Sequence, residues 1–234
     1  MRRFWAVVAV SALFFVVPAF GEEMTLKDSK DKVSYAIGLD VGNAMKKQSI
    51  DIKTDIFMRG LKDALSGEKK LLTDEEIRET MTAFSREMAD KQKEKMKILG
   101  EKNKQEGEAF LAENKKKEGI KTLASGLQYK VIEEGKGKTP KAGDTVTVNY
   151  RGTLIDGTEF DSSSKRGQPA TFPVSGVIKG WTEALQLMKE GAKWQLFIPS
   201  DLAYADKGAG GMIGPNAVLI FDVELISVKE AEKK

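Results

Sequence analysis

The chemistry open to this chain is limited from the start, because it contains neither His nor Cys. Thiol nucleophiles, Cys/His zinc sites and every triad that uses imidazole as its base are therefore excluded. Carboxylate acid–base chemistry, Ser–Lys pairs and oxygen-ligand metal sites remain, although no EF-hand or phosphate-loop spacing occurs. Any catalysis must need little proton transfer or use an isolated Asp, Glu or Tyr. We expect no metal and no cofactor.

A set of aromatic residues in the C-terminal half is the strongest sign of a binding site. Each of them alone could be ordinary core. Tyr204 is harder to explain in that way, because it lies in the glycine-rich stretch 201–211, where packing does not require a ring. A concave site lined by aromatic residues, with few polar groups, is the usual form of a pocket for a small apolar ligand. The aromatic residues in question are Tyr150, Phe160, Phe172, Trp181, Tyr204 and Phe221.

Trp181 has two interpretations. The stretch VIKGWTEALQLMKEG, residues 177–191, predicts a short helix from Trp181 to Met188 with one apolar face. On that face Trp181 could simply be core. It also follows Gly180, a residue that lets backbone approach closely, so the indole could equally form the floor of a pocket.

The elements that must position these aromatic residues show the period-two alternation of strands. The alternating runs 146–150, 194–198 and 219–225 predict strands, and the turn at 155–157 suits a hairpin. One short helix lies between the strand segments. Residues 123–229 are therefore expected to form an α+β domain, in which an antiparallel sheet is wrapped on one short helix.

The chain before this domain is expected to be helical. Residues 22–88 read as three amphipathic helices, with a capping box at 73–76 that opens the third. Such short helices make a thin core, and a second copy of the module can supply the missing burial. Gly38 and Gly42 lie one turn apart and would let another helix approach closely. We therefore expect a homodimer through this module.

Helix-forming composition continues over residues 89–122, but with many charges and few apolar anchors. This pattern predicts a charged linker helix that acts as a solvated spacer, with Gly100 and Gly107 as weak points. A short charged tail, residues 230–234, ends the chain.

The first segment, residues 1–21, predicts export. Two arginines precede an apolar run, and Ala19-Phe20-Gly21 provides a small-residue cleavage site typical of a signal peptide. The alternative is an uncleaved membrane anchor. We expect the periplasm as the destination, with outer-membrane association or secretion as alternatives. The net charge of only +3 gives no reason to expect nucleic acid as a partner.

Three runs of sequence resemble, in order and spacing, the FKBP-type peptidyl-prolyl cis–trans isomerases. They are VTVNYRGTLIDGTEFDSS, FPVSGVIKGWTEALQLMKEGAKWQLFIPSDLAYADKGAG and NAVLIFDVELISV. The layout of signal peptide, helical module and charged helix is similar to the macrophage infectivity potentiator branch, in which the N-terminal helices make a dimer. The resemblance implies an FKBP-like fold, isomerase activity and binding of macrolide FKBP ligands.

The resemblance also implies roles for ten residues. Trp181 would be the floor under the proline ring, and the Ile178 backbone N–H and the Tyr204 hydroxyl would donate hydrogen bonds to substrate carbonyls. Asp161 would be a buried carboxylate held by Tyr150 and Arg166. The implied catalytic residues are Asp161, Tyr204, Trp181 and Phe221, and the implied substrate-binding residues are Tyr150, Phe160, Phe172, Val177, Ile178 and Ile213. The chain departs from the family pattern at Ala170, Ala205 and Gly214.

An apolar pocket can catalyse this reaction without an acid or a base. Rotation about an X–Pro bond destroys amide resonance, with a barrier of ~18–20 kcal/mol. The twisted state has less charge separation than the planar amide, so a dry apolar site favours it. The implied function is to assist the folding of exported proteins by binding their proline-containing, unfolded chains. Two alternatives remain: a dimeric holdase-type chaperone and a non-catalytic module that binds proline peptides.

Overall fold

The computed structural model describes residues 25–67 and 69–231, and the chain divides into two compact units, Met1–Thr73 and Asp74–Lys234. The predicted signal peptide, residues 1–21, lies outside the described residues. Within those described residues, no helix is both long enough and apolar enough to cross a membrane.

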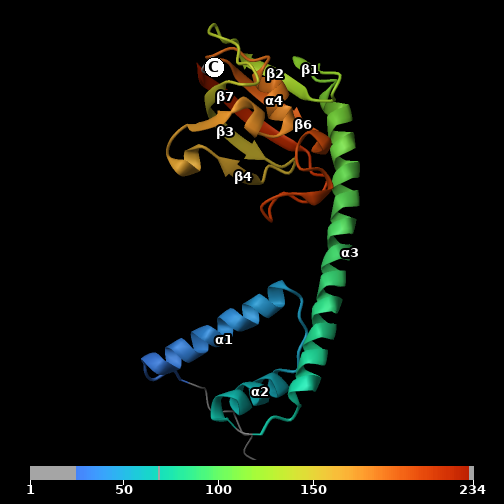
Figure 1. Ribbon diagram of the computed structural model, residues 1–234, viewed down its shortest axis with the longest axis vertical. Helices are drawn as coiled ribbons and strands as arrows, with labels where there is room; N and C mark the ends of the chain where they lie inside the picture. The colour runs from blue at the N-terminus through green and yellow to red at the C-terminus, as the bar shows by residue number, and fades with distance from the viewer. Residues whose placement is uncertain (1–24, 68, 232–234) are drawn as a thin grey trace, which may run out of the picture. The chain divides into compact units, whose positions relative to one another are not determined.

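The first unit contains α1 (Ser29–Lys47) and α2 (Thr54–Ser66), which Figure 1 shows in blue and teal. The side chain of Asp28 caps α1 by accepting a hydrogen bond from the Asp31 N–H at 2.8 Å. Helix α2 ends at Gly67, which has a left-handed φ of 69°. These helices confirm the predicted helical character of this part of the chain.

The second unit begins with the long helix α3 (Asp74–Asn114) and continues into an antiparallel sheet with the strand order β1-β2-β6-β7-β3-β4, in which β5 also pairs with β3. The short helix α4 (Lys179–Leu185) packs against the sheet. This arrangement confirms the predicted α+β fold. The strands are β1 (Ile120–Thr122), β2 (Gln128–Glu133), β3 (Thr145–Thr153), β4 (Glu159–Ser162), β5 (Ala170–Pro173), β6 (Lys193–Ile198) and β7 (Leu219–Lys229).

The hydrophobic core lies between the sheet and α4. The alternation that predicted β3 places Val146, Val148 and Tyr150 on the buried face, and β6 and β7 alternate in the same way over most of their length. Helix α4 contributes Trp181 and Leu185 from the other side. The sheet therefore presents its aromatic residues to the helix that carries the tryptophan.

Helix α4 differs from its sequence prediction at both ends. It begins at Lys179 rather than at Trp181, because Ile178 is extended and its carbonyl accepts the Trp181 N–H at 2.9 Å. It ends at Leu185 rather than at Met188, although the Met188 N–H still donates to the Ala184 carbonyl at 3.1 Å. Trp181 is thus within the first turn but does not open the helix.

The prediction for residues 89–122 needs correction. Helix α3 runs without interruption across residues 88 and 89, and Gly100 and Gly107 are buried within it rather than being weak points. A Cβ on Gly107 would lie 2.7 Å from Val218 Cγ2, so the missing side chain makes room for a close contact. Near the end of the helix, buried Asn114 donates a hydrogen bond to the Gln128 side chain at 3.0 Å. The second half of α3 is therefore packed on the sheet domain, not a solvated spacer.

The first residues of the expected charged tail also contact the domain. Glu230 forms an ion pair with Lys138 at 2.7 Å, and the Ala231 N–H donates to Asp144 at 3.0 Å. The hydrogen bond and charge of the Lys138 ammonium lower the pKa of the Glu230 carboxyl, and Glu230 in turn raises the pKa of Lys138. Residues 232–234 of the tail lie outside the described residues.

Candidate active site

A hollow of about 700 Å³ lies among β3, β4, β5, α4, β7 and the loop of residues 199–218, named here the β6–β7 loop. All ten residues that the family resemblance implied line this hollow. Arg166, which was also expected near the pocket, lines the hollow as well. Four further lining residues were not predicted from the sequence: Gly176, Ala209, Gly210 and Met212. The ten implied residues are Tyr150, Phe160, Asp161, Phe172, Val177, Ile178, Trp181, Tyr204, Ile213 and Phe221.

Trp181 lines the hollow and is also part of the hydrophobic core. It is only 4% exposed, and three aromatic rings meet it edge to face. The ring centroids of Tyr150, Phe172 and Phe221 lie 5.3, 6.1 and 5.2 Å from that of Trp181. Edge-to-face pairs are the favoured aromatic geometry, so these contacts fix the plane of the indole. The two interpretations of Trp181 are therefore compatible.

Two glycines, Gly180 on α4 and Gly152 on β3, allow close packing of the elements around the pocket. A Cβ on Gly180 would lie 2.5 Å from Ile198 Cγ2, so its absence lets α4 lie directly on β6. A Cβ on Gly152 would lie 2.7 Å from ring atoms of both Phe160 and Phe221. The Phe160 and Phe221 rings meet edge to face, with their centroids 5.4 Å apart. The close approach of the backbone to a neighbouring side chain at each glycine shapes the apolar pocket.

One polar group stands at the rim of the pocket. The Tyr150 hydroxyl donates a hydrogen bond to Asp161 at 2.5 Å, and Arg166 Nη2 lies 3.0 Å from both Asp161 carboxylate oxygens. The same Arg166 nitrogen also contacts the Tyr150 hydroxyl. These contacts match the expected grouping. The expectation that Asp161 is buried is wrong, because its side chain is 48% exposed where the pocket opens to solvent.

Strand β4, which carries Phe160 and Asp161, is anchored by a second charge cluster. Hydrogen bonds from Arg151, then from Ser162 and Lys165, lower the pKa of Glu159 to about 2. The Glu159 carboxylate lies 2.8 Å from Arg151 Nε and 3.2 Å from Lys165 Nζ. It therefore stays ionised at neutral pH and ties β4 to β3 and to the following 3₁₀ turn.

The β6–β7 loop supplies the remaining wall. Tyr204 lines the pocket while 41% exposed, and Ala205, which follows it, has a left-handed φ of 48°. Ala209 and Ile213 exchange two backbone hydrogen bonds, of 2.8 and 3.0 Å, across a tight glycine-rich turn. Ala170, where the sequence departs from the family pattern, lies on β5 and does not line the pocket.

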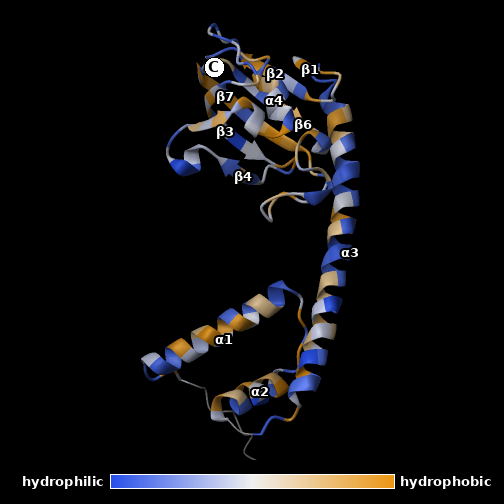
Figure 2. Cartoon of the chain, viewed as in Figure 1, coloured by the Kyte–Doolittle hydropathy of each residue, from blue (hydrophilic) through white to orange (hydrophobic). Residues whose placement is uncertain are grey.

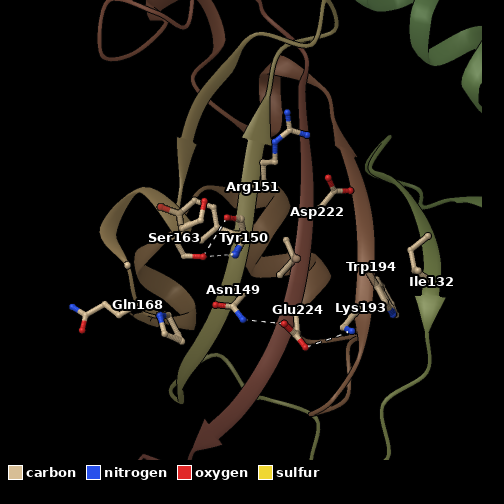
Figure 3. A pocket seen from close by; sticks show the side chains of 14 residues that line it. Ile132, Asn149, Tyr150, Arg151, Ser163, Gln168, Lys193, Trp194, Asp222 and Glu224 are labelled. Atoms are coloured by element: carbon tan, nitrogen blue, oxygen red, sulfur yellow. Dashed lines mark hydrogen bonds and ion pairs between the residues drawn. The ribbon is translucent and has the colours of Figure 1, made fainter.

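A second hollow, of about 800 Å³, lies against β3, β6 and β7 and is shown in Figure 3. Polar side chains of these strands line it and are paired with one another. Asn149 donates to Glu224 at 2.9 Å, and Lys193 lies 3.7 Å from the same carboxylate. This hollow has no cluster of aromatic rings comparable to that around Trp181. It is therefore less suited to a proline ring than the first hollow.

Comparison with known proteins matches each of the two parts of the chain to a family of its own. The family described as the domain amino terminal to FKBP-type peptidyl-prolyl isomerase matches residues 30–131. The family described as FKBP-type peptidyl-prolyl cis–trans isomerase matches residues 136–226.

Individual relatives agree over most of the chain. The outer membrane protein MIP of Legionella longbeachae is 51% identical over 207 residues, which cover 88% of this chain and 89% of that protein. The peptidyl-prolyl cis–trans isomerase Mip of Coxiella burnetii is also 51% identical, over 205 residues, with the same two coverages. The crystal structure of FkpA from Escherichia coli matches with a TM-score of 0.69 and 42% identity, covering 88% of this chain and 100% of that one. The chain belongs to the family of FKBP-type peptidyl-prolyl cis–trans isomerases.

Proposed function

We propose that the 700 Å³ pocket holds the proline ring of a polypeptide on the Trp181 indole and accelerates rotation about the preceding X–Pro bond. The observation that carries this proposal is the buried indole, surrounded edge to face by Tyr150, Phe172 and Phe221. Such a floor offers a flat apolar surface to a pyrrolidine ring. The polar groups at its rim are few, so a bound amide loses most of its water.

Desolvation is the main catalytic effect in this proposal. The planar amide has more charge separation than the twisted state, so transfer from water to an apolar site raises the energy of the planar form more. Lowering the barrier by ~7 kcal/mol would accelerate the reaction about 10⁵-fold at ~1.4 kcal/mol per decade. No residue has to transfer a proton, which fits a chain without His or Cys.

Hydrogen bonds at the rim would orient the substrate. The Ile178 N–H finds no backbone acceptor among the described residues and lies where α4 begins, beside the pocket. Tyr204, on the β6–β7 loop, lines the same pocket. We assign both groups to the carbonyls that flank the rotating bond. Asp161 would act indirectly, by holding Tyr150 and Arg166 in place at the rim.

We expect Tyr204→Phe to lower kcat/KM for an X–Pro tetrapeptide about two- to tenfold. The ring remains, and the loss of one hydrogen bond costs ~0.5–1.5 kcal/mol. A protease-free isomerisation assay measures the effect. Tyr129→Phe is the matched control, because Tyr129 stacks on Trp194, outside this pocket. Equal activities for the two variants would remove Tyr204 from the proposed substrate contacts.

The substrates would be unfolded, proline-containing chains in an exported compartment, with the periplasm as the proposed site of action. The signal-peptide pattern of residues 1–21 supports export, and one relative is named an outer membrane protein. We also propose that a macrolide FKBP ligand occupies the same pocket. Its ring system would replace the proline on the Trp181 floor.

The first unit supports the proposal of a homodimer. Figure 2 shows apolar residues along both α1 and α2, and α1 buries none of its residues. On α1, Ile37 is 60% exposed, and on α2, Leu65 is 81% exposed. Isolated helices of this length are marginal in water unless an apolar face is packed. A second copy of this unit would cover these faces, and no atom of the described residues lies within 4 Å of a Cβ built on Gly38 or Gly42.

We expect the chain from residue 22 onward to sediment as a dimer and Ile37→Asp to shift it toward monomer. A charge at an exposed position costs a single copy little, but burying it unpaired at an interface costs several kcal/mol. Analytical ultracentrifugation over a range of concentrations measures the shift. Asp40→Asn, an exposed change on the same helix, serves as the control. A monomeric wild-type chain would rule out the dimer.

A further inference from the structure

The second half of α3 lies directly against the β6–β7 loop. This loop carries five of the residues that line the pocket, among them Tyr204 and Ile213. Three residues of the helix form the contact stripe: Gly100 and Gly107 are buried, and Asn103 is half-buried. Their spacing of three and four residues places them on one face of the helix. All three residues of the contact stripe are small or polar.

Two side-chain amides join the helix to the loop. Asn103 Nδ2 donates a hydrogen bond of 2.8 Å to the carbonyl of Pro215, a residue buried in the loop. In the opposite direction, Asn216 Nδ2 donates to the carbonyl of Gly100 at 3.2 Å. These bonds connect positions that are 112 and 116 residues apart in the chain. The pair is reciprocal, because each side provides one donor and one acceptor.

Close packing accompanies the hydrogen bonds. A Cβ on Gly214 would lie 2.9 Å from Asn103 Nδ2 and 3.0 Å from Leu99 Cδ2, so a side chain there would displace these two helix side chains. A Cβ on Gly100 would lie 3.1 Å from Pro215 Cβ. The glycine at 214, one of the departures from the family pattern, is thus explained by the helix that lies over it.

The contact extends to the pocket through the backbone. The Asn216 N–H donates to the Ala205 carbonyl at 2.7 Å, and Ala205 directly follows Tyr204. Both Ala205 and Asn216 have left-handed φ angles, 48° and 56°, which residues other than glycine rarely adopt. Such conformations persist only where the surroundings hold them. Ile213 directly precedes Gly214, so both ends of the pocket-lining segment of the loop are fixed next to α3.

We infer that α3 positions the β6–β7 loop for catalysis, with Asn103 and Asn216 as the positioning residues for Tyr204 and Ile213. The inference rests on the proposed function of the pocket. It extends the isomerase module into α3, to about Leu99, although every lining residue of the pocket lies after residue 123. The loop turn contains Gly208, Gly210 and Gly211 at positive φ, so without these anchors its backbone has wide conformational freedom.

The test uses Asn103→Ala and Asn216→Gly in the full chain from residue 22. Glycine at 216 keeps the left-handed backbone and removes only the side-chain amide. We expect kcat/KM for an X–Pro tetrapeptide to fall about three- to tenfold in each variant. Gln105→Ala is the control, because Gln105 is an exposed amide on the same helix; it should keep wild-type activity.

A double-mutant cycle separates positioning from a general loss of stability. If Asn103 acts through Tyr204, Asn103→Ala should lower kcat/KM less in a Tyr204→Phe background than in the wild type. Effects that simply multiply would overturn the inference, and so would wild-type activity in both asparagine variants. An inactive wild-type chain would instead reject the proposed function itself. The two failures are therefore distinguishable in one set of measurements.

Discussion

Trp181→Leu is expected to lower kcat/KM for an X–Pro peptide by at least about tenfold while the protein remains folded. Leucine keeps apolar filling beneath the pocket but removes the flat surface on which the proline ring would lie. It also removes three edge-to-face contacts, each worth ~0.5–1.5 kcal/mol beyond the buried area. The stability cost should stay below the ~3–5 kcal/mol typical of truncating a buried tryptophan to alanine. Weaker binding of a macrolide FKBP ligand should accompany the loss of activity.

Trp194→Leu is the matched control for this prediction. Trp194 is 6% exposed, and its ring stacks on Tyr129 at a centroid distance of 4.3 Å, but it lines the second hollow, of about 800 Å³, rather than the proposed active site. The two variants should lose comparable stability, and only Trp181→Leu should lose activity. If Trp181→Leu keeps full activity and ligand affinity, the indole is not the floor of the catalytic pocket.

Gly180→Ala is expected to destabilise the second unit by about 1–3 kcal/mol. Within a helix this change normally stabilises by roughly 0.5–1 kcal/mol, so packing has to outweigh propensity. The added Cβ would lie 2.5 Å from Ile198 Cγ2, a distance that real side chains do not tolerate, and overpacking of this kind costs ~1–3 kcal/mol. Urea denaturation followed by fluorescence of Trp181 and Trp194 measures the change.

A second substitution shows whether that contact is responsible. Ile198→Leu removes the γ2 methyl that the new Cβ would meet while keeping the side-chain volume. It should recover part of the loss in the Gly180→Ala background and cost stability in the wild type. A stability gain from Gly180→Ala alone would show that α4 does not lie on β6 as closely as described.

The strands and the pocket residues could be predicted because their signals lie in short, continuous stretches of the sequence. The alternation over 146–150 marks β3 because each inward residue is apolar and each outward residue is polar. The pocket residues were found through the spacing of motifs that resemble the family, and all ten line one hollow. Of the four further lining residues, Gly176, Ala209 and Gly210 are small and carry no chemical signal of their own, and Met212 lies in a glycine-rich stretch without a motif that marks it.

The packing of α3 could not be predicted in the same way. Its contact stripe uses Gly100, Asn103 and Gly107, which a search for apolar periodicity reads as a polar, weakly helical surface. Their role depends on Pro215 and Val218, more than a hundred residues away, and only the tertiary structure brings these groups together. The exposure of Asp161 was missed for a related reason, because burial depends on the shape of the pocket mouth.

A protease-free assay on a short X–Pro peptide measures whether the apolar pocket isomerises X–Pro bonds without proton transfer. The chain has no His or Cys, so kcat/KM should be nearly constant between about pH 6 and pH 8. We expect the wild-type chain to accelerate isomerisation over this range and a macrolide FKBP ligand to suppress that acceleration. Absence of acceleration, or a bell-shaped pH profile across the same range, would contradict this expectation.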